Sequence, residues 1–244
     1  MTAPLFLVPS AALAGEQIRL DGPEGRHAAV VRRLGVGERV DVSDGAGSVA
    51  CCQVVEVGAG SLTLRVLDRY ADPPPSPRLV VVQALAKGDR AEAAVEAMTE
   101  VGVDEIVPWA ASRSVVRWEG PRGEKSLDRW RSTAREAAKQ SRRPRVPVVS
   151  GLASTRQVCE RLSAADLAVV LHEAADSPLS KASTPPAGEL IVVVGPEGGI
   201  TDDELAAFAA AGAPAYRLGR SILRTATAGV AAAAVLLAHT GRWD

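Results

Sequence analysis

The sequence predicts a mixed α/β protein with a small N-terminal β-barrel and a larger domain built on a parallel sheet. Residues 1–70 contain short strand-like runs divided by glycine turns, a spacing typical of small barrels. Four prolines follow within 72–77, and neither a strand nor a helix continues through such a segment. Beyond it, short Val- and Ile-rich runs alternate with helical segments, the pattern of an α/β sheet buried on both faces. We therefore expect two domains, at 1–71 and 78–244.

The individual elements follow from periodicity and from turn residues. In the first domain we expect one helical segment at 23–34 and strands at 5–8, 17–20, 39–42, 49–57 and 62–67. In the second we expect strands at 79–85, 106–109, 146–149, 167–171, 190–194 and 215–218, and helices at 90–101, 127–140, 156–162, 202–211 and 225–239. The last helix is alanine-rich and apolar on nearly every side, so it must be buried in the core or against another subunit.

Composition excludes several classes of protein. With 244 residues, 47% hydrophobic and 23% charged, the chain is neither disordered nor fibrous. Its three cysteines, Cys51, Cys52 and Cys159, lack zinc-site spacing and form no disulfide framework, so a cytoplasmic location is expected. No secretory signal is visible, and the most apolar tract, 226–238, is too short to span a membrane.

Charge is distributed unevenly along the chain. The formal net charge is −1, yet residues 113–147 hold eleven Lys or Arg against four Asp or Glu. This excess predicts a site for a polyanion, with a solvated helix face as the alternative. Arg142, Arg143 and Arg145 lie beyond the expected helix end, where helix-dipole stabilisation does not account for them, and phosphate contacts are the functional interpretation.

A glycine turn at 195–199 follows directly on an expected buried strand. Thr201 and Glu204 have the spacing of a capping box for the next helix. Ligands bind at the carboxyl ends of strands in open α/β sheets, and glycine lets a ligand approach the backbone closely. The turn matches neither a dinucleotide fingerprint nor a P-loop. A tight strand–helix turn without a ligand is the alternative.

A second candidate segment is 218–227, where another expected strand ends before the alanine-rich helix. Arg224 and Thr225 lie at that helix's N-terminus, which favours an anion, although Thr225 has a capping role as its alternative. Two successive strand ends with glycine loops favour one shared pocket. Metal and serine-hydrolase motifs are absent from the sequence.

An ordered series of motifs runs almost from end to end. The motifs are 27–32 (HAAVVR), 44–45 (DG), 87–90 (KGDR) with Glu92, Glu100 with Gly102, 112–113 (SR), 140–141 (QS) with Arg143, 171–173 (LHE), 195–199 (GPEGG), 218–219 (LG) and 222–225 (ILRT). In this series the chain resembles the RsmE family, the 16S rRNA uridine-N3 methyltransferases of the SPOUT superfamily. It departs from the family at Lys139, Arg142 and Ala226, where an acidic residue, a glycine and a glutamate are usual.

The resemblance implies a PUA-like RNA-binding barrel and a SPOUT domain whose last segments form a trefoil knot, which general topology rules would not predict. It implies a homodimer that binds S-adenosylmethionine and methylates N3 of a specific uridine in 16S rRNA of the small ribosomal subunit. The cofactor residues it implies are Leu171, His172, Glu173, Gly195, Glu197, Gly198, Gly199, Leu218, Gly219, Ile222 and Leu223. No membrane or metal is expected as a partner.

The implied catalytic residues are Arg224 and Glu197. Arg224 would stabilise the developing uracil anion, and Glu197 or His172 would accept the N3 proton; the sequence does not decide between them. The target base must be unpaired or extruded. The expected RNA-binding residues are His27, Arg32, Arg33, Arg90, Arg113, Arg135, Gln140, Arg142, Arg143 and Arg145.

Three alternatives stay open at this point. One is a related SPOUT enzyme that acts on a ribose 2′-hydroxyl or another rRNA or tRNA position. Another is a non-catalytic RNA-binding assembly factor with the same fold. A nucleotide-dependent oxidoreductase is disfavoured by the missing dinucleotide fingerprint.

Overall fold

The computed structural model describes residues 3–88 and 90–243, so Asp89 of the 87–90 motif lies outside the described residues. The chain forms two compact units. The first unit comprises the residues up to Pro74 together with Ala138–Val146, and the second comprises Pro75–Ala137 and the residues from Pro147 onward. The first junction falls within the proline-rich segment. Residues 138–146, which the sequence assigns to the second domain, pack with the first unit instead.

The first unit is built on a five-stranded sheet in the order β1-β3-β4-β5-β2. Its strands are β1 (Leu5–Leu7), β2 (Gln17–Leu20), β3 (Arg39–Ser43), β4 (Ser48–Gly58) and β5 (Ser61–Ala71). All five overlap the predicted strands. β1 is parallel to β3 and the other pairs are antiparallel. This order describes a sheet with β1 and β2 at its two ends, and closure into a barrel stays a prediction.

The predicted helix at 23–34 is two short elements, α1 (Gly22–Arg26) and a π-helical turn, η2 (His27–Val31). A 3₁₀ turn, η1 (Ser10–Ala14), precedes β2. In η2 the N–H of Arg32 donates to the carbonyl of His27 at 2.8 Å. Ala28 is fully buried among the strands' apolar side chains, which anchors this segment to the sheet.

The second unit has a six-stranded sheet in the order β11-β9-β10-β6-β7-β8, with every pair parallel. Its strands are β6 (Arg78–Ala84), β7 (Glu105–Trp109), β8 (Val148–Val149), β9 (Leu167–Leu171), β10 (Glu189–Val194) and β11 (Ala215–Tyr216). Its helices are α2 (Arg90–Val101), α3 (Gly120–Gln140, whose last residues belong to the first unit), α4 (Thr155–Leu162), η3 (Leu179–Lys181), α5 (Asp202–Ala210) and α6 (Thr225–His239). The predicted mixed α/β architecture is therefore confirmed.

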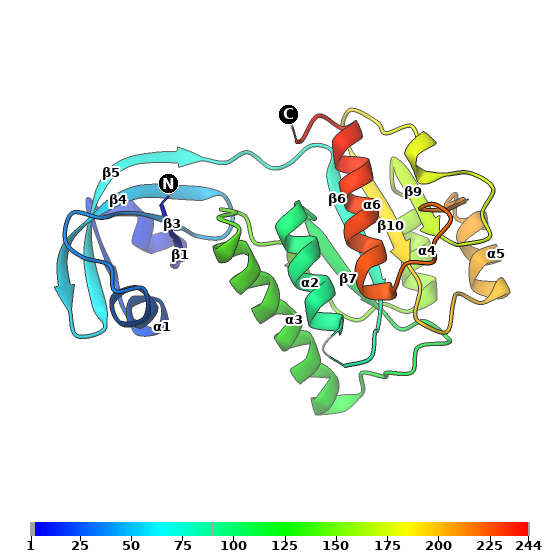
Figure 1. The fold of residues 1–244 in the computed structure, drawn as a ribbon, viewed down its shortest axis with the longest axis horizontal. Coiled ribbons are helices and arrows are strands. Elements are labelled where there is room, and N and C mark those ends of the chain that lie inside the picture. The colour runs from blue at the N-terminus through cyan, green and yellow to red at the C-terminus, as the bar shows by residue number, and fades with distance from the viewer. Residues whose placement is uncertain (1–2, 89, 244) are drawn as a thin grey trace. The chain divides into compact units, whose positions relative to one another are not determined.

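Both faces of this sheet are covered, which explains the continuous apolar runs. Leu79 and Val81 of β6 pack in one layer with α2, α3 and α6. Their neighbours Val80 and Val82 pack in the opposite layer with α4 and α5, because successive strand residues point to opposite faces. Figure 1 shows α2 and α6 side by side on the same face.

One helix and two strands differ from the predictions in length. α3 begins at Gly120, where the predicted helix begins at 127. The added segment is charged and has few apolar residues, so it carries little hydrophobic periodicity. β8 and β11 span only two residues each. Among the described residues, no helix combines the length and the apolar character needed to cross a bilayer.

Candidate active site

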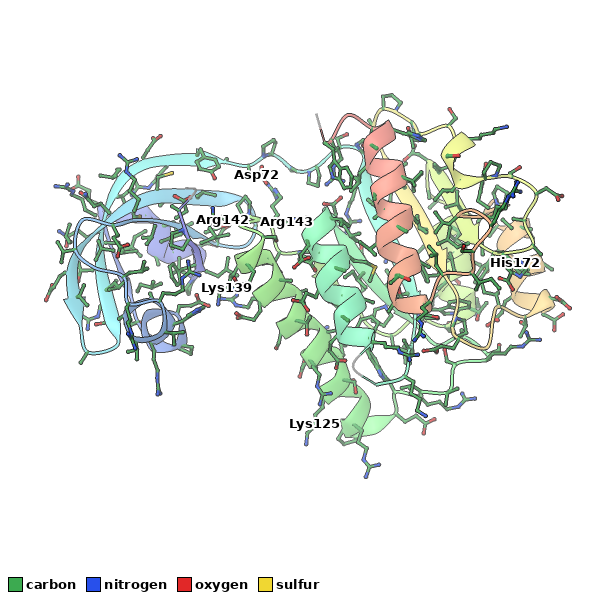
Figure 2. The ribbon with its side chains drawn as sticks, in the orientation of Figure 1. Asp72, Lys125, Lys139, Arg142, Arg143 and His172 are labelled. Carbon is green, nitrogen blue, oxygen red and sulfur yellow. The ribbon has the colours of Figure 1, made fainter. Side chains whose placement is uncertain are left out.

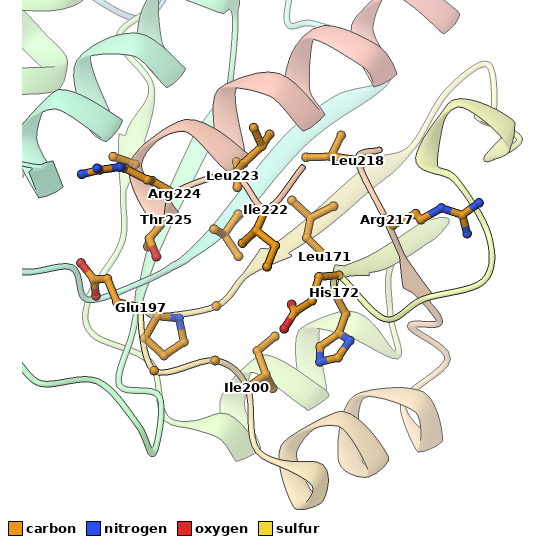
Figure 3. Close-up of a pocket in the computed structure, with 18 of the residues that line it drawn as sticks. Leu171, His172, Glu197, Ile200, Arg217, Leu218, Ile222, Leu223, Arg224 and Thr225 are labelled. Atoms are coloured by element: carbon orange, nitrogen blue, oxygen red, sulfur yellow. The ribbon is translucent and has the colours of Figure 1, made fainter. Parts of the chain in front are cut away.

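Three loops meet at the carboxyl edge of the parallel sheet in the second unit. They follow β9, β10 and β11, and together with the start of α6 they line a pocket of about 610 Å³. In a parallel sheet the carboxyl ends of neighbouring strands lie at one edge, and this edge is where such folds bind ligands. The volume lies within the usual range of small-molecule sites. The predicted shared pocket is therefore present (Figure 3).

All eleven residues expected to hold a cofactor line this pocket. So do Arg224, the expected catalytic arginine, and Arg90 and Arg113, which were expected to contact RNA. Sequence reasoning missed further lining residues, which are Val194, Pro196, Ile200, Asp202, Arg217, Ser221, Thr225, Ala226 and Ala228. All but Asp202 and Ala228 lie within two residues of a predicted residue, so extending each expected motif by two residues would have found those seven.

The glycine turn presents bare backbone because side chains have no room there. A Cβ on Gly195 would lie 2.7 Å from Cγ1 of Ile200. A Cβ on Gly198 would lie 3.0 Å from both the Cβ and the carbonyl oxygen of Arg113. Gly199 has φ +76°, in the left-handed region that favours glycine. The three glycines therefore contribute backbone alone to this wall, beside Pro196 and Glu197.

Glu204 holds the glycine turn in place. Its Oε2 accepts from the N–H of Thr201 at 3.0 Å, completing the capping box predicted at the start of α5. Its Oε1 accepts from the N–H of Ser112 at 2.8 Å, which connects the turn to the loop after β7. Burial alone would raise the pKa of Glu204, but the hydrogen bonds from Ser112 and Thr201 outweigh it and hold that pKa below its ordinary value.

Arg224 and Glu197 lie on one side of the pocket. Arg224 is the N-cap residue of α6 and makes no side-chain cap hydrogen bond. Oε1 of Glu197 accepts from the backbone N–H of Lys87 at 3.3 Å. In the view of Figure 3, Glu197, Thr225 and Arg224 appear on one side of the pocket and His172 on the other.

His172 already uses one ring nitrogen. Its Nδ1 accepts from the N–H of Ala174 at 3.3 Å, an arrangement in which neutral imidazole carries its proton on Nε2. Oε1 of Glu197 is engaged in the same way by the N–H of Lys87, so the choice between these two bases stays a prediction.

The other expected RNA-binding residues are spread over both units. In the first unit, His27, Arg32, Gln140 and Arg142 line a second, smaller cavity, and Arg33 is exposed. Arg143 also belongs to the first unit, while Arg135 is exposed on α3.

Arg145 is engaged within the first unit. Its Nε donates to the carbonyl of Asp72 at 3.1 Å and to that of Pro73 at 3.2 Å. These contacts use donors that an RNA phosphate would need. Its RNA contact stays a prediction.

No group of three or more His, Cys, Asp or Glu side chains within the described ranges could hold a metal ion.

Comparison with known proteins places this site in a family. Residues 73–237 match a family described as an RNA methyltransferase domain, and residues 20–67 match an RNA methyltransferase PUA domain. The chain is similar to ribosomal RNA small subunit methyltransferase E of Mycobacterium tuberculosis, with 46% identity over 100% of this chain and 95% of the relative. It is 31% identical to the protein of the same name in Bacillus subtilis, over 86% of this chain and 85% of the relative.

A solved structure agrees with these sequence matches. The ribosomal RNA small subunit methyltransferase E of Neisseria gonorrhoeae, bound to S-adenosyl methionine, superposes with a TM-score of 0.84 at 27% identity, covering 97% of this chain and 98% of that one. The first unit is thus PUA-like, and the second has the fold of the SPOUT methyltransferase neighbours. The predicted resemblance is confirmed: this chain belongs to the RsmE family of ribosomal RNA methyltransferases.

Proposed function

We propose that this protein methylates 16S rRNA of the small ribosomal subunit, with S-adenosylmethionine as the methyl donor. The observation that carries this function is the convergence of three strand-end loops into one pocket of about 610 Å³, in a chain that belongs to an rRNA methyltransferase family.

The residues of the pocket fit this cofactor. Apolar surface for an adenine ring comes from Leu171, Leu218, Ile222 and Leu223. The glycine turn supplies peptide groups that no side chain of its glycines covers. We assign cofactor binding to the eleven residues named above. When bound, the cofactor supplies a methyl group on a sulfonium sulfur, and the protein has to align the nucleophile with that methyl.

The proposed nucleophile is N3 of a uridine. N3 bears a proton in neutral uracil, so methylation requires that this proton leave as the new N–C bond forms. Glu197 accepts the proton in our proposal, and Arg224 offers donors to the uracil oxygens, where negative charge develops. Paired or stacked uridine cannot reach these groups, so the substrate base is unpaired or extruded.

A second subunit completes the site in our proposal. Ile222 is 78% exposed although it lines the pocket. On α6, Val230, Ala231, Ala234 and Val235 are only partly covered, in contrast to the buried row at Ala228, Ala232 and Leu236. These apolar side chains have a natural partner in the second copy of a homodimer.

We also infer a cytoplasmic location, because the ribosomal substrate of the proposed reaction is found there.

The remaining predictions on architecture belong to the same proposal. We infer that residues 1–71 form a PUA-like RNA-binding barrel and that 78–244 form the catalytic domain. For the trefoil knot, the support is the path after β10. The chain goes to β11 at the sheet's edge, beside β9, and then returns as α6 to pack against β10 and β6.

The test is incubation of small ribosomal subunits that lack the modification with labelled cofactor, followed by nucleoside analysis. We expect labelled 3-methyluridine. A labelled 2′-O-methyl nucleoside would instead indicate the related SPOUT activity. RNA binding without cofactor binding, measured by calorimetry, would identify a non-catalytic assembly factor and contradict the proposal.

A further inference from the structure

A small cavity in the first unit collects residues that are far apart in the sequence. It has a volume of about 60 Å³ and is lined by Pro4, Leu5, Phe6, His27, Arg32, Lys139, Gln140 and Arg142. All of these residues belong to the first unit, because 138–146 pack with it. We call this cavity the Arg32–Arg142 notch.

The π-helical turn η2 builds one wall of the notch. In an α-helix, side chains five residues apart are separated by about 140° around the axis. In η2 the hydrogen bond from the N–H of Arg32 to the carbonyl of His27, at 2.8 Å, spans five residues, and both residues line the notch. π-helical turns are rare and occur frequently at functional sites.

The last residues of α3 and the residues that follow it build another part of the lining, and a buried ion pair fixes them. Nζ of Lys139 lies 2.8 Å from Oε1 of Glu24, with both side chains largely buried. Arg142, three residues further on, has φ +58°, a conformation that non-glycine residues rarely adopt and that folds retain mainly where surrounding structure imposes it. Figure 2 shows Lys139 and Arg142 at the end of α3.

The notch keeps an uncompensated positive charge. Lys139 is neutralised by Glu24, but neither Arg32 nor Arg142 forms an ion pair with any residue that the structure describes, and both are exposed. Elsewhere in this unit Arg145 is paired with Asp72. Two arginines that line one small cavity favour an oxyanion, which guanidinium binds through parallel hydrogen bonds.

The size of the notch selects among anionic groups. Its volume of about 60 Å³ is about one tenth of that of the pocket in the second unit, a size that suits a small group such as a phosphate and not a nucleobase. The rings of His27 and Phe6 meet edge to face at a centroid distance of 6.0 Å, so His27 is held against the apolar wall.

We propose that the Arg32–Arg142 notch binds a single phosphodiester group of the RNA substrate, held jointly by Arg32 and Arg142. The proposal rests on the proposed function for the identity of the polyanion. It names one phosphate site where the sequence indicated only a set of separate basic residues.

The test measures how binding of full-length 16S rRNA transcript by the intact protein depends on salt. Each phosphate contact contributes about one unit to the slope of log K against log salt. We expect Arg32→Gln and Arg142→Gln each to reduce the slope by about one unit. The double variant should lose about one unit as well, because both side chains hold the same phosphate.

Arg26→Gln is the matched control. Arg26 is exposed at the end of α1 in the same unit, is absent from the notch lining, and has the same charge. Its slope should stay at the wild-type value, and thermal melting should show every variant folded. An unchanged slope in Arg32→Gln or Arg142→Gln, an equal loss in Arg26→Gln, or a loss of two units in the double variant would overturn the shared site. Cofactor binding measured on the same proteins tests the proposed function separately.

Discussion

The two edges of the six-stranded sheet differ in whether their charged side chains form ion pairs. At the amino edge, Arg78 lies 2.5 Å from both Glu105 and Glu189, and Arg161 lies 2.6 Å from Glu105. At the carboxyl edge, Arg113, Glu197 and Arg224 line the pocket, and none of them forms an ion pair with a described residue. Charge is neutralised where it stabilises the fold and left available where we expect chemistry.

The same contrast applies to backbone. The carboxyl edge has a glycine turn whose glycines line the pocket and have no room for side chains at Gly195 and Gly198. At the amino edge side chains contact one another instead: Glu105 is 4% exposed and also accepts from the hydroxyl of Ser150. Replacements at the two edges should therefore separate catalysis from stability.

The largest expected effect is at Arg224. Arg224→Ala should lower kcat for rRNA methylation by about 10²–10³-fold, because one donor to the developing anion is lost. The free energy of unfolding should be unchanged. Arg220→Ala is the control, since Arg220 is exposed in the same loop but does not line the pocket. Equal kcat in the two variants would contradict the role of Arg224.

At the amino edge we expect the reverse. Glu105→Gln should lower the free energy of unfolding by about 3 kcal/mol, because it leaves the two arginines without their buried partner. The kcat of the folded protein should be retained. Glu160→Gln, in an exposed pair with Arg156, should change denaturant unfolding little. A drop in kcat for Glu105→Gln without loss of stability would erase the distinction between the edges.

The lowered pKa of Glu105 predicts how the free energy of unfolding depends on pH. Burial raises the pKa of Glu105, but hydrogen bonds from Arg161 and Ser150 and the charges of Arg161 and Arg78 lower it from 4.5 to about 2. A lowered pKa stabilises the folded state above the unfolded value, and this contribution is lost as pH falls from 4.5 towards 2. The difference in unfolding free energy between wild type and Glu105→Gln should be constant above pH 5 and shrink below it. Parallel curves down to pH 2.5 would count against this network.

The smallest of these effects is expected at the glycine turn. Gly198→Ala should weaken S-adenosylmethionine binding roughly tenfold, because its Cβ would meet the Arg113 carbonyl at 3.0 Å and shift the turn. Calorimetry measures the affinity. Gly151→Ala, whose Cβ would have nothing within 4 Å, should bind like wild type. Equal affinities would show that the turn tolerates a side chain.

Local patterns predicted the pocket well because its parts are local. The glycine turn, the capping box at Thr201 and Glu204, and the strand ends each lie in one short segment, and parallel topology brings such ends together. The strands were predictable for a similar reason, since burial on both faces requires continuous apolar runs.

Features that depend on distant residues could not be read in this way. Arg78, Glu105 and Arg161 are separated by tens of residues, and no periodicity links them. Lys139 lies in the basic stretch that suggested phosphate contacts, yet it is 6% exposed and pairs with Glu24, which is distant in sequence. The π-helical turn at η2 also has an ordinary helical pattern in its sequence.

The assignment of 138–146 to the first unit means that the polypeptide enters that unit twice. Ser43 is fully buried and donates to the carbonyl of Pro144 at 2.8 Å, and the N–H of Val146 donates to the carbonyl of Gly45 at 2.9 Å. A fragment truncated at the proline-rich junction would expose these groups to water and lose one wall of the notch. Proteolytic cleavage between Pro74 and Pro75 would likewise not free the PUA-like unit, because the second crossing still tethers it.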